Sequence, residues 1–200
     1  HPFAWKVLGA VLKQTGKNQD ALAAMKTSAR LAPQDAEAHN NLGSTFLALG
    51  KLKEAESSCK RAIDLKPDYP EAFFNLGIVL QESHRHVSAE KFYKKAISYK
   101  PDYIEAHYNL GITQQTLKKY TDAETSYKNA LAINPNFARA HNNIGVIRQK
   151  TGSLNDAILN YELAIDIDDE YPEAHNNLGT ALKDLGSLEE AESCYRKAIS

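Results

Sequence analysis

Six glycines recur at a fixed spacing of 34 residues, and this spacing restricts the fold more than any other feature of the chain. They are Gly9, Gly43, Gly77, Gly111, Gly145 and Gly179. No insertion or deletion interrupts them, and such a period is typical of arrays in which each repeat packs against its neighbours. We therefore predict a single array with repeats at about residues 2–35, 36–69, 70–103, 104–137, 138–171 and 172–200. Because the chain begins at His1 and the last repeat is truncated, we expect a fragment of a longer protein.

Each repeat has the residue spacing of two helices. When the recurring glycine is numbered position 8, positions 4, 7, 8 and 11 fall on one face at about 100° per residue, which predicts an amphipathic helix that we call the A helix. In the second half, position 20 is always alanine and position 27 is small. Position 24 is large or soft: Met25, Cys59, Tyr93, Tyr127, Tyr161 and Tyr195. This i, i+4, i+7 pattern predicts a second helix, the B helix, and an all-α protein.

Glycine and proline mark the ends of the predicted helices. Proline at position 32 stops the B helix in four repeats: Pro33, Pro67, Pro101 and Pro135. Glycine at position 15 supplies a left-handed cap after the A helix in four repeats: Gly16, Gly50, Gly152 and Gly186. His84 and Lys118 stand at position 15 in the other two repeats, where a side chain in that conformation costs about 1–2 kcal/mol. These two turns are therefore candidates for a remodelled backbone.

The charge balance and apolar runs exclude some classes of partner. The chain has 24 Lys+Arg and 25 Asp+Glu, so we expect no nucleic-acid partner, which would require a basic surface. No apolar run reaches the roughly 18 residues of a membrane span, so we expect no membrane partner and a soluble, cytoplasmic protein. Four i, i+4 pairs on the B helices predict salt bridges: Glu56–Lys60, Glu90–Lys94, Glu124–Lys128 and Glu192–Arg196.

The repeats resemble tetratricopeptide repeats (TPRs). The family pattern W-x2-L-G-x2-Y, A-x3-F, P at a 34-residue period matches Trp5–Leu12 followed by Ala21 and Met25, and it matches Pro70–Gly77. The resemblance implies a right-handed superhelical solenoid of about six helix–turn–helix repeats, with A helices lining a concave groove. The E-A-H-x-N-L-G variant, as in Glu105–Gly111, is most similar to the repeats of O-GlcNAc-transferase-type and related bacterial TPR proteins.

An asparagine ladder is the main candidate for binding. Positions 2, 6, 9 and 13 lie about 180° from the core face of the A helix, so they face the groove. Position 6 holds Asn41, Asn75, Asn109, Asn143 and Asn177. Each amide offers a donor and an acceptor to an extended peptide backbone, and the resemblance implies that role for these residues. Alternatively, the asparagines bond a neighbouring helix or persist by repeat duplication.

Other groove positions predict selectivity. Phe74, Tyr108, Ile78 and Ile112 make the middle of the groove apolar and aromatic, and they complete the predicted peptide-binding site. The ends are predicted to be polar: Asn40, Ser44, Asn176 and Thr180. Some TPR domains clamp a terminal carboxylate with lysine and arginine, but groove-facing bases are sparse here, so such a clamp is not expected.

No residue pattern predicts catalysis, a metal or a cofactor. Histidine recurs at position 4 as His39, His107, His141 and His175. These histidines take the packing slot of Trp5 and Phe73, and neighbours would lie about 8–10 Å apart, too far to share a zinc ion. Neither cysteine has a basic, motif-like setting, and Cys59 occupies a core slot. We therefore expect no enzyme activity from this segment.

The sequence thus predicts a protein- or peptide-binding scaffold. Two alternatives remain open. The first is that the array recruits substrates for a glycosyltransferase or sulfotransferase domain elsewhere in a longer protein. The second is self-assembly through the array ends, where Ala191, Tyr195 and Ala198 would be partly uncovered and a homo-oligomer could form.

Overall fold

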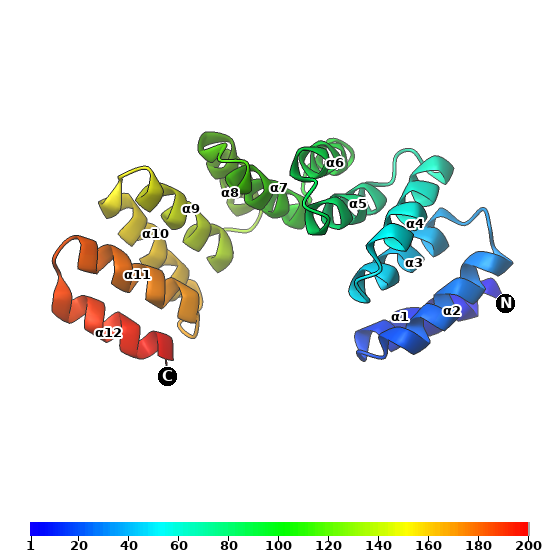
Figure 1. Cartoon of the computed structure of the whole chain (residues 1–200), viewed down its shortest axis with the longest axis horizontal. Coiled ribbons are helices and arrows are strands. Elements are labelled where there is room, and N and C mark those ends of the chain that lie inside the picture. The colour runs from blue at the N-terminus through cyan, green and yellow to red at the C-terminus, as the bar shows by residue number, and fades with distance from the viewer. Residues whose placement is uncertain (200) are drawn as a thin grey trace. The chain divides into compact units, whose positions relative to one another are not determined.

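A computed structural model describes residues 1–199, and over that range the chain forms twelve α-helices and no strand (Figure 1). The A helices are α1 (Pro2–Gln14), α3 (Ala36–Ala48), α5 (Pro70–Glu82), α7 (Ile104–Thr116), α9 (Ala138–Lys150) and α11 (Pro172–Asp184). The B helices are α2 (Asn18–Leu31), α4 (Leu52–Leu65), α6 (His86–Tyr99), α8 (Tyr120–Ile133), α10 (Leu154–Ile167) and α12 (Leu188–Ile199). The predicted all-α solenoid of helical repeats is confirmed.

The helices group into two compact units, residues 1–113 and 114–200, with the boundary inside α7. Within each unit, consecutive helices pack on one another: α1 on α2, α3 on α4 and α5 on α6 in the first, and α9 on α10 and α11 on α12 in the second. B helices also pack on the A helix of the next repeat: α2 on α3 and α4 on α5 in the first unit, and α8 on α9 and α10 on α11 in the second. Neighbouring repeats therefore share a continuous core within a unit.

The recurring glycine brings the two helices of a repeat together. A methyl group added to Gly77 would lie 2.6 Å from Tyr93 Cε1, and one added to Gly145 would lie 2.6 Å from Tyr161 Cε1. Both tyrosines are fully buried. In these repeats the aromatic ring at position 24 therefore occupies the space that a side chain at position 8 would need.

Alanine at position 20 and the residue at position 24 form the innermost layer of each unit. Ala55, Ala89, Ala123 and Ala157 are completely buried. Cys59 takes the core slot that the sequence predicts and is also completely buried, and both cysteines are free thiols. Burial, together with the charge of Glu56, raises the pKa of Cys59 to about 12, so the thiol stays protonated near neutral pH.

The predicted helix ends are confirmed. The four position-15 glycines have φ between 68° and 88°. His84 and Lys118 adopt the same left-handed conformation, with φ of 57° and 60°, so these two turns are not remodelled as the cost of a side chain suggested. The B helices end before their prolines, as α4 does at Leu65 before Pro67. Backbone geometry at this turn is thus set by the repeat and is imposed even on side chains that disfavour it.

The position-4 histidines have a structural role in the turns between repeats. His107 Nε2 lies 2.9 Å from the Pro101 carbonyl oxygen, and His175 Nε2 lies 2.9 Å from that of Asp169. Both rings are buried, whereas His39 and His141 make the equivalent contacts from half-buried positions. The ring donates a hydrogen bond to a carbonyl in the turn that follows the preceding B helix, which an apolar side chain could not do.

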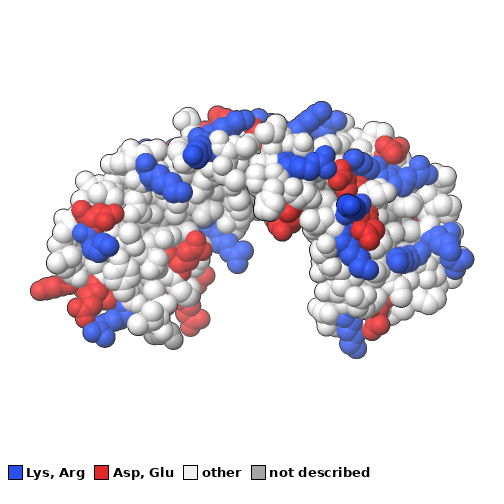
Figure 2. Space-filling model, in the orientation of Figure 1, with Lys and Arg blue, Asp and Glu red and all other residues white. Residues whose placement is uncertain are grey.

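All four predicted i, i+4 salt bridges form on the B helices. Two of their carboxylates also reach the next repeat, because Glu56 pairs with Arg85 and Glu124 pairs with Arg148. Lysine and arginine lie interspersed with aspartate and glutamate on the face shown in Figure 2.

Candidate functional site

The five ladder asparagines all lie half-buried on the A helices, three in the first unit and two in the second. We call the A-helix face that carries positions 6 and 9 the A-helix surface, and we describe it separately for each unit. The asparagines are not equivalent, because their partners depend on the residue at position 5 of the preceding repeat.

Two ladder asparagines bond an asparagine of the preceding repeat. Asn75 Nδ2 donates to Asn40 Oδ1 at 2.8 Å, and Asn177 Nδ2 donates to Asn142 Oδ1 at 3.0 Å. Each bond spans two A helices of one unit. A primary amide has a second N–H and an oxygen with two lone pairs, so these residues retain hydrogen-bonding capacity.

The other three follow repeats with Lys6, Phe74 or Tyr108 at position 5, and they do not make this bond. Asn109 Nδ2 donates to the Glu105 carbonyl oxygen one turn earlier in its own helix, at 2.8 Å. Asn143 Nδ2 donates to Tyr127 Oη at 3.2 Å. Asn41 borders a cavity between α1 and α3.

The four apolar residues predicted to line the groove are half-buried, so part of each side chain packs in the core and part is exposed: Phe74, Ile78, Tyr108 and Ile112. The Phe74 ring packs against Tyr103 with centroids 4.9 Å apart and against Tyr93 at 5.8 Å. Such aromatic contacts fix the orientation of the ring. Phe74 and Ile78 belong to the first unit and pack partly against its core cluster.

The structure corrects one predicted groove residue. Asn40 was expected to make a groove end polar, but only 5% of its surface is exposed. It is buried because its amide donates to Tyr69 Oη and accepts from Asn75 between two repeats. Ser44, Asn176 and Thr180 retain exposed or half-buried positions.

A row of glutamines at position 12 was missed by the sequence reasoning. Tyr93 Oη donates to Gln81 Oε1 at 3.0 Å, and the same geometry recurs for Tyr127 with Gln115 and for Tyr161 with Gln149, at 2.9 Å each. The available signal was the coincidence of glutamine at position 12 with tyrosine at position 24 in repeats three to five. The pairs hold the amides at the edge of the A-helix surface.

A lysine was also missed. Lys13 and Asn41 line a cavity of about 370 Å³ in the first unit, together with Ala10, Gln14, Met25 and Ser44. Lys13 Nζ donates to Ser44 Oγ. The cavity places the Lys13 cation beside the ladder asparagine Asn41. Lys13 is at position 12, whereas the groove stripe was predicted from positions 2, 6, 9 and 13.

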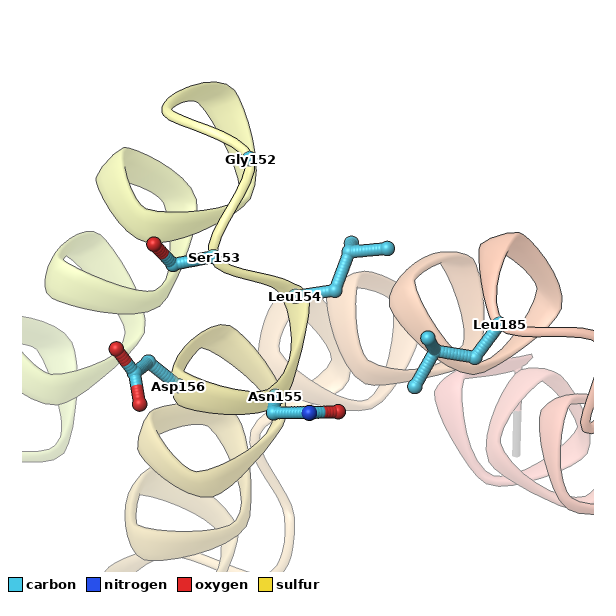
Figure 3. Close-up of a pocket in the computed structure, with 6 residues that line it drawn as sticks. All are labelled: Gly152, Ser153, Leu154, Asn155, Asp156 and Leu185. Atoms are coloured by element: carbon cyan, nitrogen blue, oxygen red, sulfur yellow. The ribbon is translucent and has the colours of Figure 1, made fainter.

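A second hollow, of about 440 Å³, lies in the second unit at the turn between α9 and α10, beside Leu185 at the end of α11 (Figure 3). Leu154, Asn155 and Leu185 face it, whereas the side chains of Ser153 and Asp156 point away from it in this view. It is lined by turn residues and lies away from the ladder. We assign it no role.

Over the described range, no three histidine, cysteine, aspartate or glutamate side chains lie close enough to share a metal ion. Residues 1–199 also contain no helix with the length and apolar character that a membrane crossing requires.

Comparison with known families agrees with the helix pairs and the 34-residue period. Five family models match, four described as tetratricopeptide repeat and one as TPR repeat, at residues 7–70, 46–110, 104–137, 150–186 and 174–200. The chain belongs to the TPR family. Curated proteins give no match.

Several solved structures share the fold of this chain. PilF of Pseudomonas aeruginosa superposes with a TM-score of 0.87 at 20% identity, covering 96% of this chain and 88% of that one. MamA from Desulfovibrio magneticus RS-1 superposes with a TM-score of 0.75 at 23% identity, covering 82% of this chain and 93% of that one. YrrB is described as a TPR protein with an unusual peptide-binding site. It superposes with a TM-score of 0.72 at 20% identity, covering 88% of this chain and 91% of that one.

Proposed function

We propose that this TPR chain is a scaffold that binds an extended segment of another protein on its A-helix surface. The observation that carries the proposal is the ladder of half-buried asparagines. The amides of Asn75, Asn109 and Asn177 each donate one N–H within the fold, and a primary amide has a second N–H and an acceptor oxygen. An extended peptide has one N–H and one C=O per residue, and both must be satisfied when it is bound. The peptide-binding site described for YrrB supports the same class of function for this fold.

Apolar side chains beside the ladder would provide selectivity. Tyr108 and Ile112 lie one position before and three positions after Asn109 on α7, and all three are half-buried. A peptide whose backbone bonds the asparagine would place alternate side chains against this helix. We propose that apolar or aromatic peptide residues are preferred there.

Replacement of Asn41 and Asn109 tests the proposal with the smallest disturbance of the fold. Within residues 1–199, neither side chain hydrogen-bonds another helix, so Asn41→Ala with Asn109→Ala should leave the helical circular dichroism unchanged. Retention of a pool of random, N-acetylated and C-amidated peptides on the immobilised protein should fall about tenfold or more. The matched control is Asn129→Ala, at an exposed position of α8. Undiminished peptide retention by the double variant would exclude the asparagine ladder as the peptide-binding site.

Self-association is a second candidate, which we propose because two helices expose apolar faces. Trp5, Leu8 and Val11 on α1 are 39–50% exposed, although the equivalent Phe73, Leu76 and Val79 of α5 are buried. On α12, Leu188 and Ile199 are also exposed and border a mainly apolar hollow. Light scattering over a range of protein concentrations tests this candidate, and a constant monomer mass would exclude it.

A further inference from the structure

Among the described residues, those that line the cavity beside Asn41 include the cation of Lys13 and no carboxylate. Its polar atoms come from Lys13, Gln14, Asn41 and Ser44, and its apolar wall includes the buried Met25. In the part of the chain that the structure describes, the one side-chain bond of Lys13 is to the neutral hydroxyl of Ser44. Burial lowers the pKa of the Lys13 ammonium, as expected when a charged group loses water.

The same helix shows how a balanced lysine is arranged. Lys6 Nζ lies 3.0 Å from Asp35 Oδ2 and 2.7 Å from Glu37 Oε2. These hydrogen bonds outweigh the effect of burial and leave the pKa of Lys6 above its usual value. The two lysines are seven residues apart on α1, yet within residues 1–199 Lys6 has carboxylate partners and Lys13 has none.

Comparison with other repeats shows why the cavity exists. Lys13 and Met25 occupy positions 12 and 24, which hold Gln149 and Tyr161 in the fifth repeat. There the tyrosine hydroxyl donates to the glutamine oxygen and the polar groups satisfy each other. Methionine has no hydroxyl and lysine has no acceptor, so the first repeat leaves donors facing an open space.

We propose that Lys13, Asn41 and Ser44 form a binding site for the carboxylate of an aspartate or glutamate side chain within a bound peptide. The ammonium supplies the charge, and the amide and hydroxyl supply further N–H and O–H donors to the carboxylate oxygens. The site lies beside the first ladder asparagine, so a peptide backbone on the A-helix surface could present a side chain to it. This inference rests on the proposed peptide-binding function.

Two pools of short random peptides, N-acetylated and C-amidated, test the site. One pool has glutamate fixed at a central position, and the other has glutamine there. The immobilised full chain should retain the glutamate pool about tenfold more than the glutamine pool. Lys13→Gln installs the residue found at position 12 in repeats three to five, so it should fold normally and abolish the preference while retention of the glutamine pool persists. The matched control is Lys183→Gln, which removes the same charge from the exposed position 12 of the sixth repeat and should keep the preference.

The outcomes separate this site from the general function. Equal retention of both pools by the unmodified chain overturns the carboxylate site and leaves peptide binding intact. A preference that survives Lys13→Gln also overturns it. Retention of neither pool overturns both proposals. A third pool with phosphoserine at the fixed position assigns the cavity to phosphate instead if its retention exceeds that of the glutamate pool and depends on Lys13.

Discussion

At the scale of single residues, the repeat depends on two contacts between position 24 and the A helix. Where position 24 is tyrosine, its ring fills the space left by the glycine at position 8, and in three repeats its hydroxyl bonds the glutamine at position 12. One side chain thus fixes both the separation and the register of the two helices. Replacements at these positions separate the steric contribution from the polar one.

Gly145→Ala should lower the free energy of unfolding by about 1–3 kcal/mol, because the new methyl group would meet the buried ring of Tyr161. Urea denaturation measures the loss. In a Tyr161→Ala background the cost should largely disappear, since the space is then empty. Gly152→Ala is the control: it meets no atom within 4 Å but is strained by its φ of 87°, so its cost should be the same in both backgrounds.

Tyr161→Phe should lower the free energy of unfolding by about 0.5–1.5 kcal/mol, because it removes the 2.9 Å hydrogen bond to Gln149 and keeps the ring. Tyr195→Phe is the matched control. Tyr195 is half-buried and its hydroxyl lies 3.3 Å from Thr180, so the loss should be smaller. An equal or larger loss at Tyr195 would show that the Tyr–Gln pair contributes little.

At the scale of elements, helix ends and ion pairs join one helix to the next. The left-handed residue at position 15 redirects the chain between the two helices of a repeat, and the Glu124 carboxylate links α8 to α9 through Arg148. Both features differ between repeats, so a substitution can give one repeat the turn residue or the ion pair of another.

Lys118→Gly should raise the free energy of unfolding by about 0.5–1 kcal/mol. Glycine removes the left-handed strain at φ of 60°, and part of the gain is offset by greater freedom of the unfolded chain. The reverse change, Gly152→Lys, should lower stability by a similar amount. Thermal unfolding of both variants tests the two expectations. A Lys118→Gly variant that is less stable than the unmodified chain would show that Lys118 is not strained.

Stability should fall on acidification through the Glu124 site. Burial alone would raise the pKa of Glu124, but hydrogen bonds from Lys128 and Arg148 outweigh burial and leave the pKa below its usual 4.5. A carboxyl group whose pKa is depressed on folding stabilises the protein above its unfolded pKa, and the contribution is lost as the pH falls through the folded value. Denaturation between about pH 7 and pH 3 should therefore show a smaller pH dependence in Glu124→Gln and in Arg148→Gln. An unchanged dependence in both would remove this ion pair as a cause.

At the scale of the whole molecule, burial is unevenly distributed among the helices. Gly9 is the one buried residue of α1, and Ala191 is the one buried residue of α12 within the described range. By contrast, α5 and α9 each bury six residues. In a repeat protein, stability is roughly a sum over repeats and their interfaces, so regions with fewer interfaces open first.

Backbone amides of α1 should therefore exchange hydrogen faster than those of α5, and those of α12 faster than those of α9. Hydrogen–deuterium exchange followed by mass spectrometry of the 200-residue chain measures this directly. Equal protection of α1 and α5 would indicate that the first unit opens as one cooperative body.

The 34-residue period, the alternation of A and B helices, their ends and the i, i+4 ion pairs were all determined by the sequence, because each depends on residues close together in the chain. The turns at His84 and Lys118 were not predicted, because the cost of a left-handed side chain suggested a remodelled backbone, whereas the structure keeps the left-handed conformation. The hydrogen-bond partners were decided only by the tertiary structure. Whether Asn75 bonds Asn40, whether Asn40 is buried, and whether Lys13 faces a cavity all depend on which side chains of different repeats meet. Helical periodicity places a residue on a face, but it does not specify the residue opposite, and that residue sets burial and charge balance.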